Sequence, residues 1–380
     1  MTTSDPAGRR ERLEAYLAED PDNPALLAEA FDASLAAGDL PRCAVLAERG
    51  VANGADASAW ALRTARVCLA RGDAAAAEAL LQPLQAEGHA SLAIGHDLAL
   101  ARFLQGDVEG CRRLLDPWMQ AGASTRENTQ ARAAAAALWL RALHRLGRLA
   151  QALQWLEEAQ PPVDAAADVL GIASLVALDA GRFDVALALA DRCLAASPDQ
   201  AEGLVARGSV AIASADTACA EQLLARALAL RPADGRVWSA AGLARMQARD
   251  WNGAQQRLAQ AVRRMPGHVG SWHALGWTEL FRHDLAAARE AFGQALALAP
   301  AFAESHGALA MVLALSGQAE EARRSLATAR RLDPDNVTGR YARAVLRGEA
   351  GPAASRELAA AVLDRPGFFG ETLAAWLPAA

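Results

Sequence analysis

The stretch PGHVGSWHALGWTELFRHDLAAAREAFGQALALAP, which extends from Pro266 to Pro300, decides the fold. Its two terminal prolines belong to a series spaced by 34 residues: Pro198, Pro232, Pro266, Pro300 and Pro334. A proline that returns at a constant interval indicates a recurring structural unit, because proline cannot continue a helix and is suited to ending each unit. This period is long enough for two short helices and two turns.

Small and large apolar residues return at matching offsets inside these units. The second half of each unit carries a triplet: Ala254, Leu258 and Ala261, then Ala288, Phe292 and Ala295, then Ala322, Leu326 and Ala329. The spacings of four and three residues place each triplet on one helical face. In the first half of the units, Gly242 and Gly276 allow two helices to approach closely, while Trp238 and Trp272 fill the space between neighbouring pairs.

The residues of the quoted stretch are similar to the consensus of the tetratricopeptide repeat family, namely Trp272, Leu275, Gly276, Ala288, Phe292, Ala295 and Pro300. The resemblance implies an all-α fold, a right-handed α-solenoid (superhelix) of about ten helix-turn-helix repeats with capping half-repeats. Its known members bind proteins or peptides with their concave surface.

The register extends over almost the whole chain. Repeats are predicted to begin near residues 24, 58, 92, 133, 167, 201, 235, 269, 303 and 337. The first three repeats are marked by their turns, Gly38-Asp39, Gly72-Asp73 and Gly106-Asp107. Glycine at the end of a first helix, followed by a helix-starting aspartate, is the expected chemistry of a tight helix-turn-helix.

The sequence divides into five predicted segments. They are a disordered start with an N-terminal cap helix (1–23), repeats one to three (24–125), an insertion and candidate hinge (126–132), repeats four to ten (133–368) and a C-terminal cap helix (369–380). The cap helix at the start is expected over residues 8–20, after seven disordered residues. The insertion interrupts the apolar pattern between Gly122 and Arg132 with small and polar residues. Caps are expected because an uncovered terminal repeat would expose its interface.

The composition agrees with an all-α protein and suggests where it works. Hydrophobic residues make up 53% of the chain, mainly alanine and leucine, without an alternating strand pattern. The absence of an apolar run of 18 residues and of a signal sequence predicts a cytoplasmic protein without membrane insertion. All 38 basic residues are arginine, which favours a bacterial source and excludes Schiff-base or P-loop lysine chemistry.

Motifs for catalysis, cofactors and metals are not found in the sequence. It has no HExxH, GxSxG or strand-linked GxGxxG pattern, so we predict no enzyme activity, no catalytic residue, no cofactor and no metal site. The five cysteines lack CxxC spacing, and packing is the favoured role for them over redox chemistry. Nucleic-acid binding is disfavoured by the net charge of −6, and Arg263-Arg264 and Arg330-Arg331 fall at helix ends, where cations complement the dipole.

The resemblance implies that the ninth residue of each repeat points into the concave groove. This row comprises Asp32, Arg66, Leu100, Arg141, Leu175, Ser209, Leu243, Trp277, Met311 and Val345. The row is mostly polar in the first four repeats and mostly apolar afterwards. The candidate partner-binding residues are Arg66, Arg141, Leu175, Leu243, Trp277, Leu280, Met311 and Val345, with Leu280 extending the stripe one turn further.

Two interpretations of the apolar stripe stay open at this point. The stripe could be core, packed against neighbouring first helices or covered by a tail of the chain. It could also line a groove for an amphipathic helix or an extended apolar segment of a partner, because large exposed apolar patches mark interaction sites. In the second interpretation the indole of Trp277 is accessible in the free protein.

Two classes of function also stay open. The first is a non-enzymatic scaffold or adaptor that holds a protein or peptide ligand in the groove. The second is a chaperone or carrier subunit that assists an export, assembly or glycosyl-transfer machine. A homodimer formed through contacts between the terminal caps also stays open. The lysine and asparagine clamp that some family members use to bind a chaperone's terminal carboxylate has no match in this chain.

Overall fold

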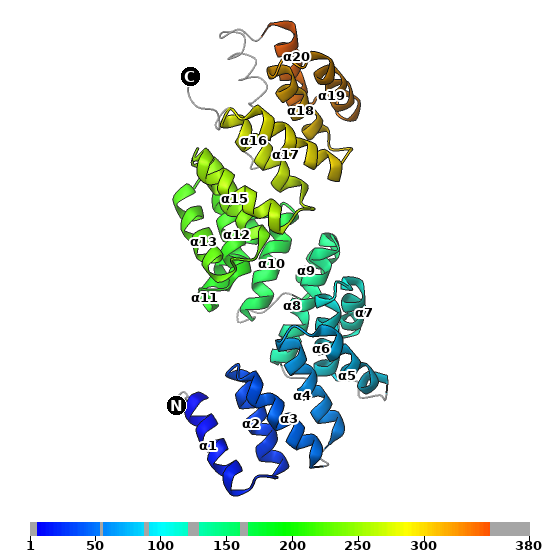
Figure 1. Ribbon diagram of the computed structural model, residues 1–380, viewed down its shortest axis with the longest axis vertical. Helices are drawn as coiled ribbons and strands as arrows, with labels where there is room; N and C mark the ends of the chain where they lie inside the picture. Colours follow the sequence, from blue (N-terminus) through cyan, green and yellow to red (C-terminus); the bar gives the residue numbers. More distant parts are fainter. Residues whose placement is uncertain (1–5, 54–55, 87–90, 121–128, 160–165, 350–380) are drawn as a thin grey trace. The chain divides into compact units, whose positions relative to one another are not determined.

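The computed structural model describes residues 6–53, 56–86, 91–120, 129–159 and 166–349. Throughout these ranges the regular secondary structure is helical, with twenty α-helices and no strand (Figure 1). The chain forms two compact parts, residues 1–176 and 177–380, and the boundary falls within one helix. None of the described helices is long and apolar enough to cross a membrane.

The N-terminal part contains nine complete helices. They are α1 (Pro6–Glu19), α2 (Pro24–Ala36), α3 (Leu40–Ala52), α4 (Ala57–Ala70), α5 (Ala74–Ala86), α6 (Leu92–Leu104), α7 (Val108–Met119), α8 (Thr129–Arg145) and α9 (Leu149–Ala159). Helix α10 (Ala167–Asp179) spans the boundary. Helix α1 packs on α2, as a capping half-repeat should.

The C-terminal part continues the series. Its helices are α11 (Phe183–Ala196), α12 (Ala201–Ala213), α13 (Thr217–Leu230), α14 (Gly235–Gln247), α15 (Trp251–Arg264), α16 (Val269–Phe281), α17 (Leu285–Leu298), α18 (Ala303–Leu315), α19 (Ala319–Leu332) and α20 (Val337–Arg347). Each first helix from α12 to α18 packs on the second helix that follows it and, through that helix, on the next repeat.

The helix boundaries follow the sequence register closely. First helices begin at the predicted residues 24, 92, 167, 201, 235, 269, 303 and 337, and α4 begins at Ala57, one residue early. Helix α8 begins at Thr129, four residues before the predicted start, so the last residues of the insertion are helical. Each of the five periodic prolines lies two residues beyond the end of a second helix.

The turns between paired helices share one backbone conformation, a residue with positive φ, although the residue type differs between repeats. Gly38 has a φ of +75°, and Asp39 then caps α3 by accepting a hydrogen bond from the N–H of Arg42. Ala215, Arg249 and His283 hold the equivalent turn position with φ between +56° and +62°. In these three repeats packing therefore enforces a conformation that glycine provides in the others, Gly317 of the ninth repeat included.

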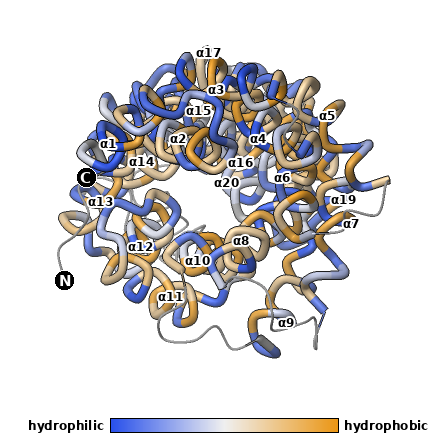
Figure 2. The backbone as a smooth tube through the Cα atoms, turned by 90° about the horizontal axis from the view of Figure 1, so that it is seen from below, coloured by the Kyte–Doolittle hydropathy of each residue, from blue (hydrophilic) through white to orange (hydrophobic). Residues whose placement is uncertain are grey.

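Close contact between paired helices depends on a glycine facing a large side chain. A Cβ at Gly276 would lie 2.7 Å from the ring of Phe292, and a Cβ at Gly242 would lie 2.6 Å from Leu258. Phe292 and Leu258 are completely buried. This confirms that glycine in the first helix allows the second helix of the same repeat to approach. Every helix nevertheless carries both hydrophobic and hydrophilic residues, as expected where one face is buried (Figure 2).

Several predicted features fall outside the described residues. These are the first five residues, much of the insertion, the second helix of the tenth repeat and the C-terminal cap helix over 369–380. The candidate hinge at 126–132 therefore stays a prediction. Helix α1 begins at Pro6, within the seven residues expected to precede it.

Candidate binding surface

The candidate residues lie on the first helices of successive repeats. Within each compact part, consecutive first helices contact one another, as α4 contacts α6, α14 contacts α16 and α18 contacts α20. A residue at the same offset in each helix therefore has a near neighbour from the next repeat. The row has a different chemical character in the two parts.

In the N-terminal part, the row residues Asp32 and Arg66 form a ladder of ion pairs with residues outside the row on neighbouring first helices. Arg63 on α4 pairs with Asp32 on α2 at 3.3 Å, and its guanidinium lies 5.2 Å from the centre of the Trp60 ring. Arg66 on α4 donates through Nε to Asp97 on α6 at 2.7 Å. The Arg66 charge is thus already balanced within the protein, which leaves less of it for a ligand than the sequence suggested.

Asp97 is the most buried group of this ladder. Burial alone would raise its pKa, but hydrogen bonds from His96 and Arg66 and the charge of Arg66 outweigh burial and hold the pKa below its ordinary value. Arg141, the last charged residue of the row, is half-buried on α8. Leu175 on α10 is only 5% exposed, so this candidate lies in the core and not on an open surface.

In the C-terminal part the row forms a partly open apolar ladder. Leu243, Trp277 and Val345 are half-buried, and so is Leu280 one turn further along α16. Met311 is 5% exposed and packs with Trp277, Leu280 and the last first helix. The stripe is therefore partly core, because its members pack between successive first helices, and partly surface.

Trp277 is at the centre of this ladder and is less accessible than the groove interpretation assumed. It packs against three apolar clusters that extend from α14 to α20. Its ring stacks on Phe281 with centroids 5.9 Å apart, and its indole N–H donates to Nε2 of His273 at 3.0 Å. Truncation of Trp277 should therefore affect folding as well as binding.

His273 holds the indole of Trp277 in place by accepting its hydrogen bond. It is 6% exposed, and burial lowers its pKa to about 4. Because Nε2 accepts from Trp277, Nδ1 carries the proton and donates to Oγ of Ser305 on α18 at 2.9 Å. The neutral imidazole thus connects two repeats through its bond to Ser305, and it orients Trp277 on its own helix.

A second buried polar network was not predicted from the sequence. Glu304 on α18 accepts hydrogen bonds from Asn336 at 2.6 Å and from Thr338 at 3.1 Å, which joins α18 to the start of α20. Burial raises the pKa of Glu304 despite these two bonds. The sequence offers one hint of this network. Asn336 and Thr338 lie at the start of a helix, about one repeat length after Glu304 in the sequence.

The remaining reactive side chains have structural surroundings. Cys43, Cys111 and Cys193 are buried, which confirms their placement at small core positions, and burial raises the pKa of Cys111 to about 12. Among the residues that the structure describes, no three histidine, cysteine, aspartate or glutamate side chains are arranged to hold a metal ion.

Comparison with known proteins finds one family match, over part of the C-terminal part of the chain. Residues 282–346 match the tetratricopeptide repeat family. No curated protein is significantly similar to the sequence. The similar solved structures include MamA (18% identity, TM-score 0.38, 42% of this chain and 94% of that one). They also include pilF of Pseudomonas aeruginosa, with 22% identity and a TM-score of 0.44 over 53% of this chain and 92% of that one. A third is YrrB, with 17% identity and a TM-score of 0.39 over 50% of this chain and 96% of that one.

Proposed function

We propose that the chain, whose residues 282–346 match the tetratricopeptide repeat family, is a non-enzymatic scaffold that binds a segment of a partner protein along its first helices. Proteins built from this repeat are generally binding scaffolds without catalytic activity. The proposal places the contact on the apolar ladder of the C-terminal part, with Leu243, Trp277, Leu280 and Val345 as the residues that the partner reaches.

One observation carries this proposal. Four large apolar side chains at equivalent or adjacent positions of the first helices α14, α16 and α20 are only half-buried, whereas Met311 at the equivalent position of α18 is covered. Large apolar side chains that stay partly exposed at equivalent positions of a repeat protein are expected at a protein-binding surface. Its spacing suits an amphipathic helix or an extended segment with regularly placed apolar residues.

The proposed setting is the cytoplasm, and the proposed partner is a protein or peptide. In the part of the chain that the structure describes, no disulfide involves Cys43, Cys68, Cys111 or Cys219, which agrees with a reducing compartment. Arg66 and Arg141 remain proposed contacts of secondary importance. A homodimer through the terminal caps remains a proposal too, because one of the two caps lies outside the described residues.

Replacement of Leu243 and Leu280 by glutamine tests the surface. Peptides selected from a displayed random library on the full chain should bind wild type, and the double variant should bind them at least ten-fold more weakly, because both contacts lose apolar area. Fluorescence anisotropy measures the affinity, and circular dichroism verifies the fold. Both leucines are half-buried, whereas Met311 is core, so these variants separate binding from folding better than Met311→Ala.

A matched control uses two leucines on second helices, Leu230 on α13 and Leu298 on α17, each 43% exposed. Their replacement by glutamine should leave peptide affinity unchanged. If the control variant lost binding while the Leu243 and Leu280 variant bound fully, the peptide would contact the second helices and not the first helices. A selected pool without any common sequence pattern would favour the chaperone alternative.

A further inference from the structure

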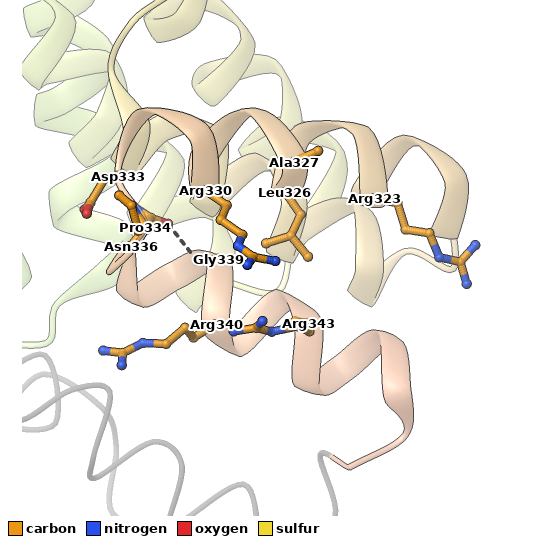
Figure 3. Close-up of a pocket in the computed structure, with 10 residues that line it drawn as sticks. All are labelled: Arg323, Leu326, Ala327, Arg330, Asp333, Pro334, Asn336, Gly339, Arg340 and Arg343. Carbon is orange, nitrogen blue, oxygen red and sulfur yellow. Dashed lines mark hydrogen bonds between the residues drawn. The ribbon is translucent and has the colours of Figure 1, made fainter.

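A cavity of about 220 Å³ lies between α19 and α20 (Figure 3). Four arginines line it, together with apolar Leu326 and Ala327. Arg330 extends from α19 towards α20, whereas Arg323 points away from the space between the helices (Figure 3). Arg343 lines the same cavity from α20. Arginines from two helices therefore lie around one cavity, beside an apolar wall formed by Leu326 and Ala327.

Most of this charge has no counter-charge in the described part of the chain. Arg323 pairs with Glu320 on its own helix. Arg330 and Arg343 make no side-chain hydrogen bond or ion pair with any described residue, and the Nε of Arg340 is buried without a hydrogen-bond partner. The Asp333 carboxylate also lines the cavity, and its Oδ1 accepts from the N–H of Asp335. A buried, unsatisfied guanidinium donor indicates a missing acceptor.

The repeat register shows that these arginines are a local departure. The positions equivalent to Arg330 are Leu228, Val262 and Leu296, and those equivalent to Arg343 are Ala241, Leu275 and Leu309. All six are apolar and buried or half-buried. At these two positions the seam between a second helix and the next first helix is thus apolar in three successive repeats and becomes cationic between α19 and α20.

The apolar wall of the same seam is also more open than in the earlier repeats. Leu326 is half-buried, whereas its equivalents Leu224, Leu258 and Phe292 are at most 1% exposed. An incompletely covered leucine beside two unpaired arginines suits a ligand that has carboxylate and apolar groups close together. A protein segment with acidic and apolar side chains has this chemistry.

We propose that the cavity between α19 and α20 binds an acidic, partly apolar peptide segment of a partner protein. The site rests on the proposed scaffold function and adds a second, electrostatic contact to it. Arg330 and Arg343 bind two carboxylates of the segment, since guanidinium groups pair with carboxylates in a forked geometry. Leu326 receives an apolar side chain. The cavity is smaller than the roughly 300–1,000 Å³ of most small-molecule sites, which favours side chains over a cofactor.

The test uses the full chain and a fluorescein-labelled peptide of three Glu-Glu-Leu-Ala repeats, measured by anisotropy. The Arg330→Leu and Arg343→Leu double variant restores the residue type of the preceding repeats, so it should fold at least as well as wild type. We expect it to lose at least ten-fold in affinity. Wild-type binding should also weaken as salt rises from 50 to 500 mM, because exposed charges are screened.

Arg324→Leu with Arg331→Leu is the matched control, because these arginines lie on α19 without lining the cavity. It should bind the peptide like wild type, and a peptide with glutamine in place of glutamate should not bind. Peptides selected for the apolar ladder should bind the Arg330 and Arg343 variant normally, so the two proposals fail separately.

Three results would overturn the proposal. The first is equal peptide affinity in wild type and the Arg330 and Arg343 variant. The second is tighter binding of a twelve-nucleotide single-stranded DNA with the same arginine dependence, which would identify a nucleic-acid site. The third is peptide binding only after Glu357→Gln with Asp364→Asn, which would show that residues 350–380 of the same chain compete for the cavity.

Discussion

We expect Phe292→Ala to lower the free energy of unfolding by about 3–5 kcal/mol, as for other large buried aromatic residues. Phe292 is completely buried, faces Gly276 and contacts the rings of His273 and Trp277 at 5.4 and 5.9 Å. Its removal leaves a cavity between α16 and α17 that neighbouring alanines cannot fill. Urea unfolding measures the loss.

The loss should stay local. Repeat proteins are stabilised by contacts between neighbours, so amide exchange should accelerate in α16 to α18 and remain unchanged in α2 to α7. Leu298→Ala is the control on the same helix, because a 43% exposed side chain should change stability by less than about 1 kcal/mol. Equal acceleration in the N-terminal helices would contradict a solenoid with nearest-neighbour stability.

The second large effect is acid destabilisation through His273. Its pKa is about 4 in the folded protein and about 6.5 when unfolded, so both states are neutral above pH 6.5. Below that pH only the unfolded state takes up the proton. Stability is therefore lost progressively from pH 6.5 to 4, by up to about 3 kcal/mol from this residue. The neighbours Trp277, Phe292 and Ser305 do not titrate in this range.

A comparison of variants isolates this contribution. Urea unfolding at pH 7 and pH 4.5 should show a smaller pH-dependent loss for His273→Gln than for wild type. His283→Asn should behave like wild type, because His283 is exposed in a turn of the same repeat. Glu304, whose raised pKa acts in the opposite direction, contributes equally to all three proteins. Identical pH dependence in His273→Gln and wild type would show that the imidazole is not held neutral.

The fold could be predicted because its determinants are local and periodic. Proline, glycine and the apolar triplets act within one repeat, so their spacing alone indicates where helices begin and end. Arg249 and His283 could not be identified from the sequence as turn residues with positive φ, because glycine is the residue type that indicates this conformation. The Glu304 network was missed because its partners come from the next repeat.

The candidate surface was predicted less completely, because exposure depends on neighbouring repeats. An offset in the repeat predicts that Leu243, Met311 and Leu175 occupy equivalent positions, but it does not predict that Leu243 is half-buried and the other two are covered. The charge of Arg66 likewise appeared available until its partner on α6 was seen. The sequence interpretation of Arg330 considered only the helix dipole, whereas the structure places it across a cavity from Arg343.

Photo-crosslinking tests the central claim most directly. Benzoylphenylalanine is placed singly at positions 243 and 280 on first helices, and at 230 and 298 on second helices, in the full chain with a peptide selected from the displayed library. A partner bound along the first helices should give peptide adducts, identified by mass spectrometry, from positions 243 and 280 and none from 230 and 298. Adducts from 230 and 298 alone would contradict a partner bound along the first helices.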